Sequence, residues 1–154
     1  MTLFSLENPV FATYAIAAAL MVLKMMGQGW MTVWRMMRSR SGFASPEDLR
    51  PGKLNPDPRP GQLDVNDYVD RSRRMHRNDL ENVLPFLAIG AVYVATAPPL
   101  WLAQAFMYGF VATRLAHALC YATQRSHEMR ATFYTIGSVI VIVMALHVLA
   151  AALA

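Results

Sequence analysis

The chain is organised around the stretch RSRRMHRNDLENVLPF, residues 71–86, where a basic segment passes directly into an apolar one. Its polar residues recur every three or four positions, which places them on one face of a helix: Arg74, Arg77, Asn78 and Glu81. Such groups at the end of an apolar helix are costly without partners or water, so they indicate a functional site. Pro85 cannot donate to the carbonyl of Glu81, and we expect a kink there.

The composition predicts an all-α membrane protein. The chain has 154 residues, of which 55% are hydrophobic. That is too apolar for a soluble domain of this size, and long enough for four membrane spans. We expect one domain over residues 1–154, folded as an antiparallel four-helix transmembrane bundle. The predicted spans are residues 9–34, 75–97, 100–122 and 130–153, with a loop at 35–74.

Charge patterning predicts the orientation of this multi-pass protein. Ten of the fourteen lysines and arginines fall between Arg35 and Arg77, whereas the termini and the turn at Pro98-Pro99 carry almost no charge. By the positive-inside rule the charged loops face the cytoplasm. The membrane is the bacterial inner membrane or the endoplasmic reticulum, depending on the source. A basic cluster between two spans sets orientation and does not indicate nucleic acid.

Three isolated features have structural interpretations. Lys24 interrupts the first span, and its amine either snorkels to the surface or is paired inside the bundle. The single cysteine, Cys120, excludes an internal disulfide. We expect no metal site, because the histidines lie on different segments without ligand spacing: His76, His117, His127 and His147.

Polar residues gather at three predicted helix ends. The second span begins with the polar stretch 74–82, and the others contribute residues three or four apart: Arg114, His117 and Tyr121, then Arg130 and Tyr134. An up-and-down bundle brings these ends to one depth. Each residue alone also fits a structural role. Arg130 could anchor the helix at the membrane surface, the two tyrosines could belong to the aromatic belt, and His117 could be a core histidine. Asp79 and Asn82 could form contacts between helices. Together they predict a polar ligand site.

The chemistry of these residues indicates the ligand. Several arginines favour carboxylates or phosphates, and Glu81 with Asp79 favours an ammonium group. A small zwitterion with more than one carboxylate fits, and glutathione is such a molecule. The lipid-facing side would admit an apolar second substrate.

These stretches resemble the MAPEG family, the membrane-associated proteins in eicosanoid and glutathione metabolism. The resemblance is greatest to the branch of microsomal glutathione transferase 1 and microsomal prostaglandin E synthase 1. The matching positions cover most of the chain in order: residues 24–26, 43–48, 73–82 and 85–86, then Arg114, His117, Tyr121, Arg130 and Tyr134.

The resemblance implies a homotrimer with three glutathione sites between neighbouring subunits. The family's glutathione-binding residues match Arg77, Asn78, Glu81, His117, Tyr121, Arg130 and Tyr134. Arg74 and Arg114 match supporting arginines, Arg38 matches an arginine from the neighbouring subunit, and Asp48 is a further candidate near the site. The arginine matching Arg130 stabilises the thiolate of glutathione and is the expected catalytic residue.

The implied function is that of a microsomal-type glutathione transferase. Ionised glutathione would attack apolar electrophiles from the bilayer, and reduction of lipid hydroperoxides is a second activity to consider. The rivals are a glutathione-dependent prostaglandin E synthase-type isomerase and a non-enzymatic lipid-binding scaffold. The residue after Arg130 is a serine in the synthase but Ala131 here, which favours the transferase. Leu49 replaces the transferase's reactive cysteine, so activation by thiol modification is not expected.

The predicted topology can be tested by labelling a cysteine introduced at Asn55. Because this residue lies in the cationic loop, only thiol reagents with access to the cytoplasmic side should modify it. Labelling from the opposite side would overturn the orientation.

Overall fold

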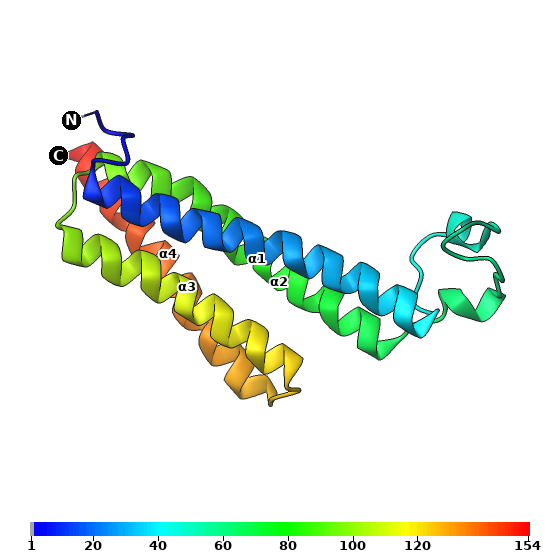
Figure 1. Cartoon of the computed structure of the whole chain (residues 1–154). Coiled ribbons are helices and arrows are strands. Elements are labelled where there is room, and N and C mark those ends of the chain that lie inside the picture. The colour runs from blue at the N-terminus through cyan, green and yellow to red at the C-terminus, as the bar shows by residue number, and fades with distance from the viewer. Residues whose placement is uncertain (1) are drawn as a thin grey trace. The chain divides into compact units, whose positions relative to one another are not determined.

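The computed structural model describes residues 2–154 and is all-helical, as predicted. Its four α-helices are α1 (Pro9–Ser39), α2 (Asp67–Ala95), α3 (Leu100–Ala122) and α4 (His127–Leu153) (Figure 1). Two short 3₁₀ helices, η1 (Pro46–Leu49) and η2 (Pro60–Leu63), lie in the segment between α1 and α2. No strand occurs among the described residues.

Local side-chain chemistry sets the helix boundaries. Asn66 caps α2, because its side-chain oxygen accepts hydrogen bonds from the backbone N–H groups of Tyr68 (3.1 Å) and Val69 (3.3 Å). Ser126 caps α4 through the N–H of Met129. Two helices extend beyond the apolar spans of the sequence: α1 continues to Ser39, and α2 begins at Asp67 and continues through Pro85.

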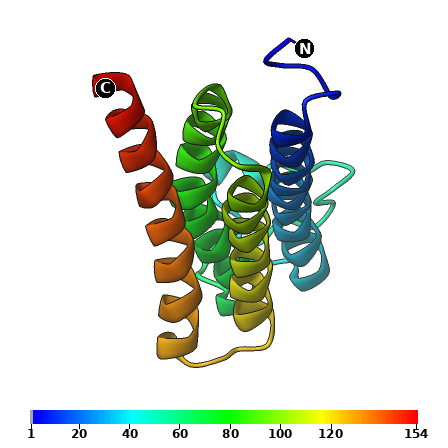
Figure 2. The same cartoon turned by 90° about the vertical axis from the view of Figure 1, so that its left-hand side faces the viewer.

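The chain forms two compact units. The first comprises Met1–Lys24 and Asn78–Ala154, and the second comprises Met25–Arg77. In the first unit α3 packs along α4, and the two helices are antiparallel (Figure 2). The core of this unit contains Phe86 of α2 stacked on Phe110 of α3, with ring centroids 4.1 Å apart and both side chains buried.

The second unit pairs the end of α1 with the start of α2 through polar contacts. The hydroxyl of Thr32 donates to that of Ser72 at 3.0 Å, and Arg35 donates to the carbonyl of Tyr68 at 2.9 Å. The intervening loop is held by the buried Gln62, whose backbone carbonyl accepts from the N–H of Phe43. These contacts order a proline-rich segment that has no regular helix through its middle.

Two of the helices, α1 and α4, are long and apolar enough to cross a membrane. Both expose large hydrophobic side chains, including Leu23 and Trp30 on α1 and Leu146 on α4. An apolar surface of this kind suits lipid or another subunit. The four-span topology and the single-domain organisation stay predictions.

Close packing at Gly90 gives a test of the fold. A Cβ atom added at Gly90 would lie 2.8 Å from the ring of Tyr14, whose hydroxyl donates to the carbonyl of Leu87. At Gly109 the nearest atom is 3.6 Å away, an ordinary contact. We therefore expect Gly90→Ala to destabilise the protein by about 1–3 kcal/mol through overpacking. Gly109→Ala should be neutral or stabilising, because alanine favours helix.

The measurement is the melting temperature of Gly90→Ala and of Gly109→Ala in detergent, which compares the same substitution in the interiors of α2 and α3. An equal change in melting temperature would show that α1 and α2 do not pack closely at Gly90.

Candidate functional site

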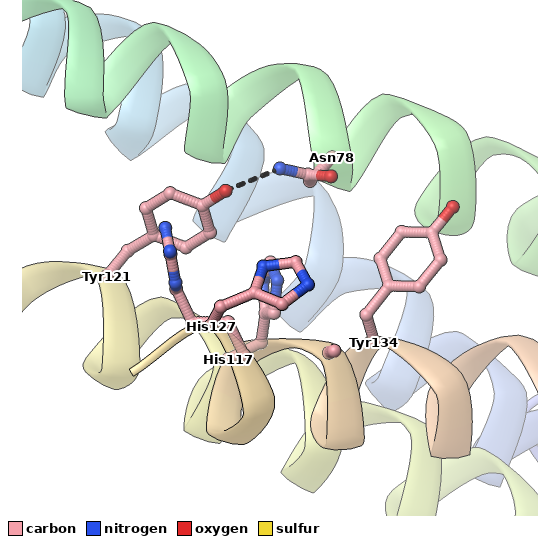
Figure 3. Close-up of a pocket in the computed structure, with 7 residues that line it drawn as sticks. Asn78, His117, Tyr121, His127 and Tyr134 are labelled. Atoms are coloured by element: carbon pink, nitrogen blue, oxygen red, sulfur yellow. Dashed lines mark hydrogen bonds between the residues drawn. The ribbon is translucent and has the colours of Figure 1, made fainter. Parts of the chain in front are cut away.

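A cavity of about 220 Å³ lies in the first unit, where the start of α4 meets α2 and the end of α3 (Figure 3). Its lining residues come from all three helices: Asn78, His117, Tyr121, His127, Arg130, Ala131 and Tyr134. None of the seven is acidic, and one is a permanent cation. The cavity is therefore suited to a ligand group that is anionic or easily ionised.

Helical spacing places the lining side chains. His117 and Tyr121 are one turn apart on α3, with ring centroids 5.1 Å apart. The hydroxyl of Tyr121 accepts a hydrogen bond of 2.8 Å from the amide of Asn78 on α2, as Figure 3 shows. This bond fixes the phenol at the wall of the cavity.

Arg130 lies in the first turn of α4. Its guanidinium carbon is 4.7 Å from the centre of the Tyr121 ring, and its Nε donates to the carbonyl of Ser126 at 3.4 Å. The first turn of a helix also has backbone N–H groups without helical partners, which favour negative charge. Arg130 thus places a positive charge on this wall of the cavity, whereas Glu128 of the same helical turn does not line it.

A cluster of charged side chains lies behind His117, away from the cavity. The carboxylate of Asp79 on α2 accepts from Arg114 Nε at 3.0 Å and from Arg114 Nη2 at 2.5 Å, and it pairs with Lys24 on α1. Arg114 Nη2 also donates to His117 Nδ1 at 3.1 Å. The side chains of Asp79 and Arg114 are completely buried. The sequence predicted a site role for Arg114, and the structure places it one contact away from the cavity.

Two further polar contacts join α2 to α4. The hydroxyl of Tyr134 donates to the carboxylate of Glu81 at 3.2 Å, and the hydroxyl of Ser138 donates to the side-chain oxygen of Asn82 at 2.7 Å. Glu81 is exposed, so its carboxylate can also meet a ligand. The first unit thus brings together seven of the predicted site residues: Asn78, Glu81, Arg114, His117, Tyr121, Arg130 and Tyr134.

The remaining predicted residues, Arg38, Asp48, Arg74 and Arg77, belong to the second unit. All four are exposed. Asp48 caps η1 by accepting from the backbone N–H of Ser45 at 3.1 Å. The guanidinium of Arg38 lies over the ring of Trp34. Their roles in ligand binding stay predictions.

Arg74 forms ion pairs with Asp70 and Asp67 within the first turns of α2. Hydrogen bonds from Arg74 and Arg71 hold the pKa of Asp67 below its usual value. The side chain of Asp67 is well exposed, so this network orders the arginines more than it stabilises the fold.

Sequence reasoning missed two features of this site. His127 lines the cavity, and its spacing of seven residues from Tyr134 and three from Arg130 could have placed it on the same face of α4. The partner of Lys24 was not predicted, because it depends on how α1 packs against α2. Within residues 2–154 no cluster of three or more His, Cys, Asp or Glu could hold a metal ion.

The sequence model of the MAPEG family matches residues 11–150. The chain belongs to the MAPEG family. Microsomal glutathione S-transferase 1 from Bos taurus is 33% identical over 144 residues, covering 94% of this chain and 92% of the relative. The Homo sapiens protein of the same name is 32% identical over 144 residues, which again cover 94% of this chain and 92% of the relative. Prostaglandin E synthase from Homo sapiens is 31% identical over 145 residues, covering 94% of this chain and 91% of the relative.

The two kinds of MAPEG relative match this chain almost equally well and almost end to end. Overall identity therefore does not decide between them. A decision depends on the residues of the cavity and on their chemistry.

Proposed function

We propose that this MAPEG protein is a membrane-embedded glutathione transferase, which binds glutathione in the first unit's cavity and conjugates its thiolate to apolar electrophiles. The observation that carries the proposal is the position of Arg130 on a cavity wall without carboxylates, in the first turn of α4. The similarity to microsomal glutathione S-transferase 1 supports glutathione as a substrate.

The proposed chemistry is stabilisation of an anion. A free thiol has a pKa of about 8.5 and is mostly protonated at neutral pH. A guanidinium and a helix N-terminus beside the sulfur favour the thiolate over the thiol, and so lower the thiol pKa. The proton leaves to solvent, the thiolate forms a bond to the electrophilic carbon, and the leaving group departs with the bonding electrons.

The other contacts position the tripeptide in this proposal. Glu81 meets the glutathione amine, while Asn78, His117, Tyr121 and Tyr134 donate or accept hydrogen bonds around the thiol end. The cavity is smaller than a typical ligand pocket of about 300–1,000 Å³. We propose that a homotrimer in the membrane completes it, with Arg38, Arg74 and Arg77 binding the glutathione carboxylates.

The cavity lining favours the transferase over the isomerase. Ala131 follows Arg130 on the cavity wall and provides no hydroxyl group. A purified protein that isomerises a prostaglandin endoperoxide but does not conjugate glutathione would establish the isomerase. A protein with neither activity, nor reduction of lipid hydroperoxides, would establish the scaffold.

Conjugation of chlorodinitrobenzene by the purified protein tests the role of Arg130. We expect Arg130→Ala to lower kcat roughly 10²-fold, the range for loss of one preorganised electrostatic contact. The KM for glutathione should change much less, and activity should recover as pH approaches the pKa of the free thiol. Arg125→Ala removes an exposed arginine from the nearby loop and should leave kcat unchanged. Equal kcat values for Arg130→Ala and the wild type would remove Arg130 from catalysis.

Binding calorimetry on Glu81→Gln tests the proposed contact with the amine. Loss of a charged hydrogen bond should weaken glutathione binding by about 1.5–3 kcal/mol. Glu7→Gln, at an exposed carboxylate near the N-terminus, is the matched control. If Glu81 instead has only a structural role, the variant should unfold at lower temperature and bind glutathione normally.

A further inference from the structure

Lys24, Asp79, Arg114 and His117 form a continuous chain of contacts from α1 through α2 to α3. All four lie in the first unit. The side chain of Lys24 is 8% exposed, those of Asp79 and Arg114 are 0% exposed, and His117 is 2% exposed as a whole residue. Only His117 at the end of this chain lines the cavity. The cluster is therefore a second layer behind the cavity wall.

The contact between Arg114 and His117 fixes the protonation of the imidazole. A guanidinium carries only N–H donors, so His117 Nδ1, 3.1 Å from Arg114 Nη2, must be the acceptor. A neutral imidazole with Nδ1 as acceptor has its proton on Nε2. His117 therefore presents a hydrogen-bond donor away from Arg114, and it cannot take a second proton at Nδ1 while this contact lasts.

The carboxylate of Asp79 divides its two oxygens between two cations. Oδ2 pairs with Lys24, and Oδ1 accepts both Nε and Nη2 of Arg114. Without the lysine, Oδ2 would be a buried carboxylate oxygen with no partner, which is costly. Arg114 Nη1 is buried without a hydrogen-bond partner, so the carboxylate would turn to receive Nη1 and Nη2 together, one from each oxygen. That arrangement uses the N–H of Nη2 that now donates to His117, and the contact with His117 is lost.

We propose that Lys24 is a positioning residue for the candidate site: by occupying one oxygen of Asp79 it keeps Arg114 in contact with His117, and so fixes His117 as a neutral hydrogen-bond donor at the cavity. Only the identity of the ligand, glutathione, rests on the proposed function, because the contacts that fix His117 involve protein side chains alone. A donor at this wall would stabilise the glutathione thiolate, and His117 would not act as its general base.

The charges around His117 agree with a fixed neutral imidazole. Arg114 contacts it from α3 itself, and Arg130 of α4 lines the same cavity. The negative charge of Asp79 on α2 is offset by Lys24 and Arg114, so the cluster keeps one net positive charge. A second positive charge on the His117 ring would be repelled by these cations, whereas an anion in the cavity would be attracted.

The protonation of His117 can be measured in the wild-type protein without glutathione. Nitrogen NMR of ¹⁵N-histidine-labelled protein in detergent distinguishes the two neutral tautomers and the imidazolium, and His117→Gln assigns the signal. We expect the Nε2–H tautomer alone at pH 7. The Nδ1–H tautomer or an imidazolium would overturn the proposal, whatever the outcome for the variants.

Lys24→Met tests the role of the lysine, with Lys53→Met as a matched control at an exposed loop position. We expect Lys24→Met to give a mixture of His117 tautomers and a roughly tenfold lower kcat, as for a lost hydrogen bond to a charged group. Lys53→Met should match the wild type in the His117 tautomer and in kcat. A single Nε2–H signal in folded Lys24→Met would refute the proposal, whereas absence of conjugation by the wild type would refute only the proposed function.

Discussion

The buried carboxylate of Asp79 is the constraint on which the arrangement of the first unit depends. Removing a carboxylate from water costs several kcal/mol, and its partners must be in place to offset that cost. Asp79 meets this requirement with Lys24 of α1 and Arg114 of α3. One side chain thus fixes the packing of three helices. A shift of any one of them by a turn would leave a charge buried without a partner.

The cavity follows from this fixed packing. Asn78 immediately precedes Asp79, and His117 and Tyr121 follow Arg114 at helical spacing, so one ion-paired layer sets the depth of three lining residues. The short connection from Thr123 to Ser126 then returns the chain to start α4 at the same depth. As a result, Arg130 in the first turn of α4 lies beside the ring of Tyr121 from α3.

Much of this arrangement could be predicted from the sequence, because helical periodicity depends only on local spacing. The all-helical fold, and the gathering of Asn78, His117, Tyr121, Arg130 and Tyr134, follow from residues three or four apart at helix ends. The pairing of Lys24 with Asp79 does not, since it joins residues 55 positions apart and depends on helix packing. For Asp48 the structure shows a local capping contact with Ser45. That contact does not reveal whether Asp48 also binds a ligand.

The proposed transferase mechanism requires the cavity to bind glutathione with its thiol ionised. Glutathione labelled with ¹³C at the cysteine Cβ reports the state of the sulfur directly, because the carbon signal shifts when the thiol ionises. We predict that the signal of bound glutathione titrates at least one pH unit below that of free glutathione, whose thiol has a pKa of about 8.5. If the bound and free signals titrate together, the cavity does not stabilise the thiolate.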